Sequence, residues 1–239
     1  MNINIIGRFY LGNGGIGDFL MFLSTFYDNV EEANIIFLAN NRKQIQEIVK
    51  LFPKIKKSLI LENDFNALKE FYGDNRCLGT GILPKDLNYQ NWNKVDIVKE
   101  YGVNLQPNFI HELFKPANLF DRQVFIQKQG SNVEKIGKQR LLLDKTISSI
   151  YKEFDFHDFL TLESFIGMTY EGIFQLILGS SVVVGVDSFV KTFAALAGKR
   201  VIVYDNIYTD EYLNNFPDKI DLGHYVFIYP FKNIELRKQ

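Results

Sequence analysis

The stretch of residues 182–204 constrains the fold of this chain most. An apolar run (Val182 to Val186), a break (Asp187-Ser188), a stretch of helical period (Phe189 to Ala197) and a second apolar run (Val201 to Tyr204) follow one another. This order predicts a buried strand, a tight turn, a helix and another buried strand. Such a unit belongs to a parallel sheet with helices packed on both of its faces.

Strand-length apolar runs alternate with segments of helical period along most of the chain, which predicts an α/β fold. Asn40-Asn41 and Asn63-Asp64 precede two of the helical segments and can cap them. The further predicted strands are Ile3 to Ile6, Ile35 to Ala39, Leu59 to Leu61, Val124 to Gln127 and Phe159 to Leu162, and the further helices are Phe19 to Phe26, Ile45 to Phe52, Phe65 to Tyr72, Val95 to Tyr101, Leu141 to Phe154 and Tyr170 to Leu178.

The periodicity weakens between about Gly79 and Pro116, where proline and asparagine are frequent. We therefore expect a boundary near residue 120 and two Rossmann-like lobes, residues 1–120 and 121–239, with the extreme C-terminus able to return to the first lobe. Ligands of such sheets bind beyond the carboxyl ends of the strands. The expected site is a central cleft that the two parallel sheets face.

Composition limits the classes of partner. The 239 residues carry a formal net charge of -1, which gives no overall field to attract nucleic acid or an anionic membrane. The single cysteine and the three histidines have no metal-ligand spacing, so neither a disulfide framework nor structural zinc is predicted. No apolar stretch reaches the roughly 18 residues of a membrane span, and the first residues lack the features of a leader. We expect a soluble, cytoplasmic protein.

A glycine-rich segment, Gly12 to Asp18, satisfies the pattern G-x-G-x-x-G between a predicted strand and a predicted helix. Dinucleotide binding also requires an acidic residue about 20 positions later, but the second strand ends in Asn40-Asn41. In addition, Arg8 to Leu11 separate the predicted first strand from the glycines, whereas the dinucleotide motif directly follows its strand. Both features count against NAD.

Asp18 has two interpretations that the local sequence leaves open. In one, Asn13, Gly14, Gly15 and Gly17 let the backbone approach a bound sugar, and Asp18 is a general base that takes a proton from an acceptor hydroxyl. The positive end of the helix would stabilise the carboxylate form. In the other, Asp18 merely caps the helix.

The turn Asp187-Ser188 is a candidate anion site, because it lies between the carboxyl end of a strand and the start of a helix. Backbone N–H groups, the Ser188 hydroxyl and the Lys191 ammonium could converge there on a phosphate. Simple capping by Ser188 is the competing interpretation.

At this point the sequence resembles the heptosyltransferase family of GT-B glycosyltransferases. Met168 to Gly172, followed by Leu178-Gly179-Ser180 and Val182 to Ser188, is similar to the nucleotide-binding segment of that family. Gly15-Ile16-Gly17-Asp18 is similar to its N-terminal loop with the catalytic base.

The resemblance implies a metal-independent inverting glycosyltransferase that needs no cofactor and moves a sugar from a nucleotide-diphosphate donor to a hydroxyl of a glycan, a lipid-linked molecule or another acceptor. It implies Asp18 as the base, with Asp187, Ser188 and the following amides around the diphosphate. Two positions depart from the family pattern: Phe189 replaces a small glycine, and Thr192 replaces a histidine, for which Lys191 could compensate. The further donor-site residues that it implies are Met168 near the nucleotide base, Thr169 and Glu171 in the same segment, Gln129, Gly130 and Ser131 in a phosphate-side loop, and one of Lys135, Lys138 and Arg140 at the leaving group.

Two other functions remain open from the residues. A dinucleotide-dependent oxidoreductase would use Gly12 to Gly17, and a non-catalytic nucleotide-sugar binder would account for Phe189. A nucleic-acid acceptor, suggested by Lys54, Lys56 and Lys57, is not expected, since a cluster of three lysines is usually a solvated face.

Overall fold

The computed structural model describes residues 7–62, 92–95, 104–117, 122–130, 141–204 and 231–239. The chain divides into two compact units between Phe109 and Ile110, within the short helix α5 (Phe109–Leu113). Sequence analysis predicted a boundary near residue 120, which is later in the chain. Each unit contains one parallel sheet, so the predicted α/β class is confirmed.

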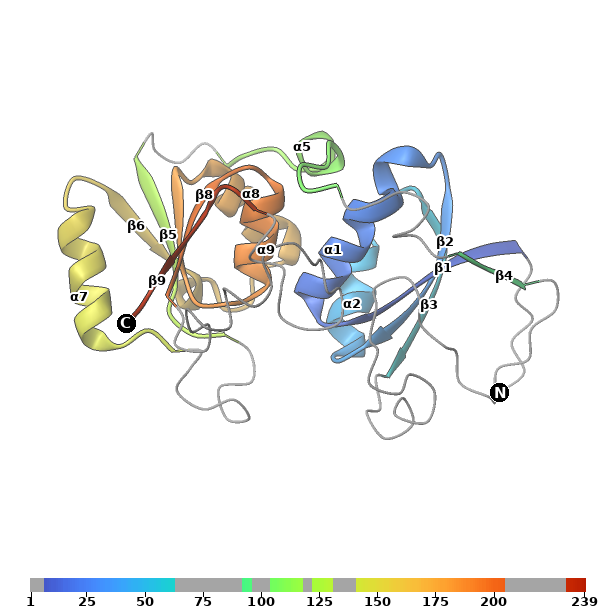
Figure 1. Ribbon diagram of the computed structural model, residues 1–239, viewed down its shortest axis with the longest axis horizontal. Coiled ribbons are helices and arrows are strands. Elements are labelled where there is room, and N and C mark those ends of the chain that lie inside the picture. Colours follow the sequence, from blue (N-terminus) through green and yellow to red (C-terminus); the bar gives the residue numbers. More distant parts are fainter. Residues whose placement is uncertain (1–6, 63–91, 96–103, 118–121, 131–140, 205–230) are drawn as a thin grey trace. The chain divides into compact units, whose positions relative to one another are not determined.

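The first unit contains a four-stranded sheet in the order β3-β2-β1-β4, and all of its pairings are parallel. Helices α1 and α2 lie next to each other against this sheet (Figure 1). The elements are β1 (Gly7–Gly14), α1 (Ile16–Phe26), the short 3-10 helix η1 (Tyr27–Asn29), β2 (Ala33–Ala39), α2 (Arg42–Val49), β3 (Ile55–Glu62) and β4 (Trp92–Val95).

Aromatic side chains hold α1 against the first sheet. Phe19, Phe22 and Phe26 recur at helical spacing and are fully buried, which confirms that this stripe is core. The rings of Phe19 and Phe37 meet edge to face, with centroids 5.0 Å apart. Gly12 permits this close packing, since a Cβ at that position would lie 2.6 Å from a ring carbon of Phe22.

Strand β1 differs from the prediction for the N-terminal segment. The predicted strand Ile3 to Ile6 lies outside the described residues, and Arg8 to Leu11, predicted to separate strand from glycines, are part of β1. Val95 was predicted to open a helix, but it lies in β4 and pairs with Tyr10. Both differences arise because strand pairing with distant partners overrides local periodicity. The predicted helix Phe65 to Tyr72 also lies outside the described residues.

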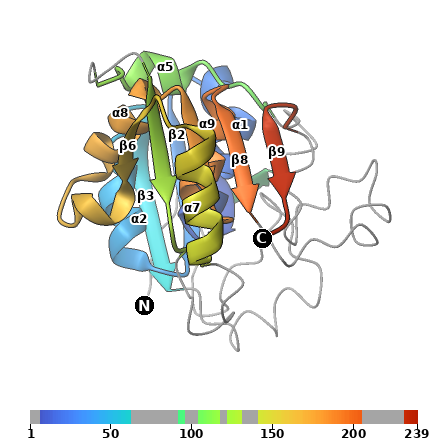
Figure 2. The same cartoon turned by 90° about the vertical axis from the view of Figure 1, so that its left-hand side faces the viewer.

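The second unit contains a five-stranded parallel sheet in the order β6-β5-β7-β8-β9. Figures 1 and 2 show α7 on one face of this sheet and α8 and α9 on the other. The elements are β5 (Gln123–Gln127), α7 (Asp144–Glu153), β6 (Asp158–Thr161), the 3-10 helix η3 (Leu162–Phe165), α8 (Tyr170–Gly179), β7 (Val182–Gly185), α9 (Phe189–Leu196), β8 (Arg200–Tyr204) and β9 (Ile234–Arg237).

The core of the second unit follows the alternation of its strands. Val124, Ile126, Val182 and Val184 form one buried cluster with Ile150 of α7. The strand and helix predictions from residue 124 to residue 204 are confirmed to within a few residues at each end. The described C-terminal residues also belong to this sheet, because β9 pairs with β8.

None of the helices in the described ranges is both long and apolar enough to cross a membrane.

Candidate functional site

The strand orders mark one position in each sheet where a ligand is expected. In open parallel sheets, ligands bind beyond the carboxyl ends of two adjacent strands whose following connections run in opposite directions. In the second sheet this switch point lies between β5 and β7, which connect to β6 and β8 on opposite sides. In the described part of the first sheet the corresponding position is between β1, which connects to β2 on one side, and β4 on the other. The two turns selected from the sequence, one after β1 and one after β7, both lie at these positions.

The turn after β1 is closed by its own side chain. Gly15 is the N-cap of α1, and its N–H donates to Oδ2 of Asp18 at 2.7 Å. Gly14 has φ +120°, and a Cβ there would overlap the Asp18 carboxylate. The geometry is that of helix capping, and the partly exposed Asp18 remains the residue that could act as a base.

The predicted sugar-binding loop is shorter than expected. Asn13 and Gly14 belong to β1, Gly17 lies in the first turn of α1, and only Gly15 stands between the two elements. The side chain of Asn41, which follows β2 and directly precedes α2, accepts a hydrogen bond from the N–H of Gln44 at 3.4 Å and so caps α2, as predicted. The position where a dinucleotide site needs an acid therefore has a structural role.

The turn after β7 is joined to the turn after β5 by side chains. Ser188 is the N-cap of α9, yet its hydroxyl makes no capping hydrogen bond and donates to Oε1 of Gln127. The amide nitrogen of Gln127 in turn donates to the carbonyl of Gln129 at 3.0 Å. Gly185 allows the strands to close here, because a Cβ would lie 2.7 Å from the Gln127 carbonyl oxygen.

A buried ion pair lies beside this turn. Nζ of Lys191 is 2.5 Å from Oδ1 of Asp187, and the two side chains are 5% and 13% exposed. The predicted contact of the Lys191 ammonium with a phosphate stays a prediction; in the structure this ammonium contacts Asp187, four residues earlier. Burial of an unpaired ammonium is costly, which explains the pairing. Thr192 is also buried, and its hydroxyl donates to the Ser188 carbonyl at 3.3 Å.

The segment before α8 lies close to the start of α9. Thr169 caps α8 by accepting a hydrogen bond from the N–H of Gly172 at 3.3 Å, and Glu171 lies in the first turn. The Phe189 ring meets the Tyr170 ring at a centroid distance of 5.9 Å. Phe189 thus fills space between the two helix starts, and Met168 beside them is 40% exposed.

Two residues at this edge were missed from the sequence. Gln127 is the polar residue that directly follows the apolar run Val124 to Ile126 of β5, and that contrast is the signal that could have revealed it. Glu163 follows β6, and its Oε1 accepts from the N–H groups of Lys128 and Gln129 at 3.1 and 3.3 Å.

The predicted phosphate-side loop is described only in part. Gln129 forms an isolated antiparallel bridge with Leu141, and Gly130 is buried. Ser131 and the candidate cations Lys135, Lys138 and Arg140 lie outside the described residues.

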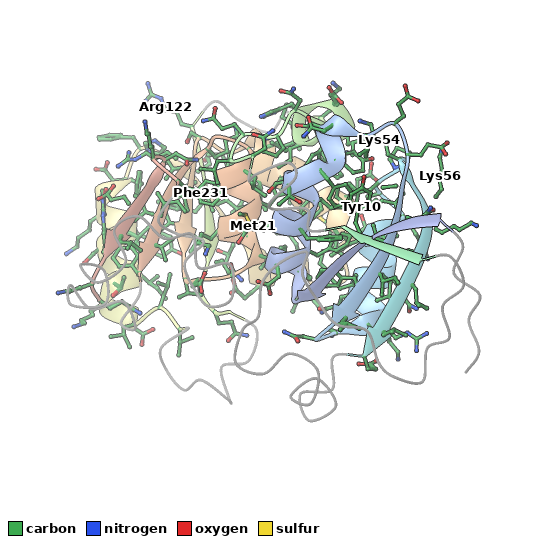
Figure 3. The ribbon with its side chains drawn as sticks, turned by 45° about the vertical axis from the view of Figure 1, so that its right-hand side comes forward. Tyr10, Met21, Lys54, Lys56, Arg122 and Phe231 are labelled. Carbon is green, nitrogen blue, oxygen red and sulfur yellow. The ribbon has the colours of Figure 1, made fainter. Side chains whose placement is uncertain are left out.

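Two of the three lysines that suggested a nucleic-acid acceptor have protein partners. Nζ of Lys54 donates to the Tyr27 carbonyl at 3.0 Å, and Nζ of Lys56 is 3.5 Å from Oε1 of Glu32. Figure 3 labels the two lysines in the first unit. In the described ranges, no three His, Cys, Asp or Glu side chains are grouped for metal binding.

No family model matches this sequence, and no curated protein is significantly similar to it.

Proposed function

We propose that this protein is a metal-independent inverting glycosyltransferase that uses a nucleotide-diphosphate sugar. The observation that carries the proposal is the start of α9. It lies at the switch point between β5 and β7, and its N-cap hydroxyl is engaged with Gln127 instead of the helix. Helix N–H groups without a side-chain cap favour an anionic group such as a diphosphate.

In the proposed arrangement, the two units are the lobes of a GT-B fold that face a cleft. The second unit holds the donor, and Asp18 of the first unit takes the proton from the acceptor hydroxyl. The acceptor oxygen attacks the anomeric carbon while the bond from that carbon to the diphosphate breaks on the opposite face. The leaving diphosphate keeps the electron pair, and the α9 amides stabilise its charge.

A non-catalytic nucleotide-sugar binder is the second candidate function. The observation that favours it is the hydrogen bond between Asp18 and the N–H of Gly15, which gives this carboxylate a structural role. An oxidoreductase has less support, because Asn41 caps α2 where a ribose-binding acid would be needed.

Binding is tested first, with a thermal-shift screen against nucleotide sugars. A ligand of the native state raises the melting temperature by mass action, so at least one nucleotide sugar should do so. If none binds, both the transferase and the binder are wrong. An NAD(P)H fluorescence titration run in parallel tests the oxidoreductase, for which we expect no binding.

Catalysis is tested with Asp18→Asn, which keeps an oxygen that can accept from Gly15 but cannot take the proton. We expect donor binding to persist and both sugar transfer and hydrolysis of the donor to be lost. Retained turnover would exclude Asp18 as the base. Absence of any turnover in the wild-type protein, despite donor binding, would select the non-catalytic binder.

A further inference from the structure

In the hydrogen bond between Ser188 and Gln127, the serine hydroxyl can only be the donor. The Gln127 side chain is 3% exposed, and its amide nitrogen must face the Gln129 carbonyl, because a carbonyl oxygen only accepts hydrogen bonds. The amide oxygen of Gln127 therefore faces Ser188. Ser188 must donate its only proton to that oxygen.

The partly exposed Ser188 consequently offers lone pairs, and no proton, to a ligand. Ionised phosphate oxygens are acceptors too. A phosphate bound to this hydroxyl would turn it away from Gln127 and leave a buried amide oxygen without a donor, which is costly. A ligand hydroxyl can donate to Ser188 without disturbing the contact.

We propose that Ser188 recognises a hydroxyl group of the ligand and that Gln127 is the positioning residue that sets this preference. The inference rests on the proposed function and assigns the phosphates to the backbone amides of α9 instead of the serine side chain. The hydroxyl belongs to the ribose or to the donor sugar.

The test compares three probes by titration calorimetry: inorganic pyrophosphate at alkaline pH, a nucleoside diphosphate and the corresponding nucleotide sugar. Ser188→Ala should weaken a hydroxyl-bearing probe about tenfold and leave pyrophosphate within about twofold, since one hydrogen bond is lost. If Ser188→Ala loses affinity for both the nucleoside diphosphate and the nucleotide sugar, Ser188 binds the ribose hydroxyl. If it loses affinity for the nucleotide sugar alone, Ser188 binds the sugar hydroxyl. Ser181→Ala is the matched control. The Ser181 hydroxyl donates to the Gln123 carbonyl at 2.7 Å beside the amino end of β7, so all three affinities should be unchanged.

Gln127→Met gives a second, independent measurement. It removes both side-chain hydrogen bonds at similar volume and frees the Ser188 proton to bind a phosphate. The preference for the hydroxyl-bearing probe over pyrophosphate should then fall, and this prediction can be checked even if Ser188→Ala does not fold.

Two results would overturn the inference: an equal loss of affinity for all three probes in Ser188→Ala, and unchanged affinity for all of them. The first would mean that Ser188 donates to a phosphate, and the second that it contacts no ligand. If the wild-type protein binds none of the probes, the proposed function itself fails. Binding by the wild type with the wrong pattern in the variants removes only the role of Ser188 and Gln127.

Discussion

The two turns at the switch points satisfy their polar groups in different ways. After β1, Asp18 accepts from the N–H of Gly15, so the helix is capped by a residue of its own first turn. After β7, the Ser188 hydroxyl donates a hydrogen bond to Gln127 of the neighbouring strand, and the Asp187 carboxylate accepts one from Lys191. The first turn is closed locally, whereas the second depends on the sheet around it.

Because of this difference, the turn with more glycines is not the better candidate for binding an anion. The turn after β1 contains the glycines that suggest a phosphate loop, yet its helix start is already capped. At α9, the side chain of the N-cap residue Ser188 makes no hydrogen bond to the helix N–H groups, and such groups favour an anion. The glycine-poor turn after β7 is therefore the better candidate for the phosphate site.

The largest expected effect is at the buried ion pair of the second turn. Asp187→Ala leaves the Lys191 ammonium buried without this carboxylate, which should lower the free energy of unfolding by about 3–5 kcal/mol. Urea denaturation followed by far-UV circular dichroism measures the loss. The only tryptophan, Trp92, lies in β4, so its fluorescence reports on the first unit and should show little change.

A double variant serves as the control for this pair. Asp187→Ala combined with Lys191→Met also removes the buried ammonium that has lost its partner, and should recover much of the lost stability. A cost below about 1 kcal/mol for Asp187→Ala alone, in the range of exposed pairs, would show that the second turn does not depend on this contact.

The next effect concerns the glycine of the first turn. Gly14→Ala combines a positive φ of 120° with a Cβ that overlaps the Asp18 carboxylate, and should cost about 2–3 kcal/mol. Gly198→Ala is the matched control, because its φ is 70° and no atom lies within 4 Å of the added Cβ. It should cost only about 1 kcal/mol. Urea denaturation followed by far-UV circular dichroism measures both costs, and Trp92 fluorescence reports the first one separately. Equal costs would mean that Asp18 moves aside freely.

The second unit could be predicted closely from the sequence, because its elements have strong local signals. Val182 to Val186 is an unbroken apolar run, and the helix that begins at Phe189 ends before Gly198, which has the positive φ expected of a helix C-terminus. Asn41 was likewise recognised as a cap from its place before a periodic segment.

The rest depends on contacts between residues far apart in the chain. Nothing local shows that Gly12 is a strand residue packed against Phe22, or that Ser188 donates to Gln127, 61 positions earlier. The pairing of Lys191 with Asp187 is consistent with their spacing of four residues, but the same spacing also leaves Lys191 at the start of α9, where a phosphate contact is the competing prediction.

A smaller effect is expected at the cap of the first turn. Asp18→Ala removes the acceptor for the N–H of Gly15 and should lower stability by about 1 kcal/mol, whereas Asp18→Asn should cost only a few tenths. Urea denaturation followed by Trp92 fluorescence measures both. If both variants were as stable as the wild type, the first turn would not be closed by Asp18, and its helix start would be as available to an anion as that of α9.

The smallest effect concerns Glu235 in β9, the edge strand of the sheet that carries the second turn. It tests whether this edge stays folded in acid, which is needed before the two turns can be compared over a range of pH. Hydrogen bonding to Arg237 holds the pKa of the Glu235 carboxyl below its usual range. A lowered pKa contributes stability above the pKa of the unfolded chain, and this contribution is lost as pH falls through the folded value. The Glu235 side chain is 46% exposed, so solvent screening keeps this contribution small, and it is lost in acid, below the ordinary glutamate pKa of 4.5.

Glu235→Gln should therefore be slightly less stable than the wild type at neutral pH, and this difference should shrink as the pH falls through the acid range. The measurement is the difference in unfolding free energy between the two proteins, followed by circular dichroism across this range. A difference that grows in acid would have the wrong sign for a lowered pKa. In that case the edge formed by β8 and β9 would itself be sensitive to acid, and only comparisons of the two turns near neutral pH would be valid.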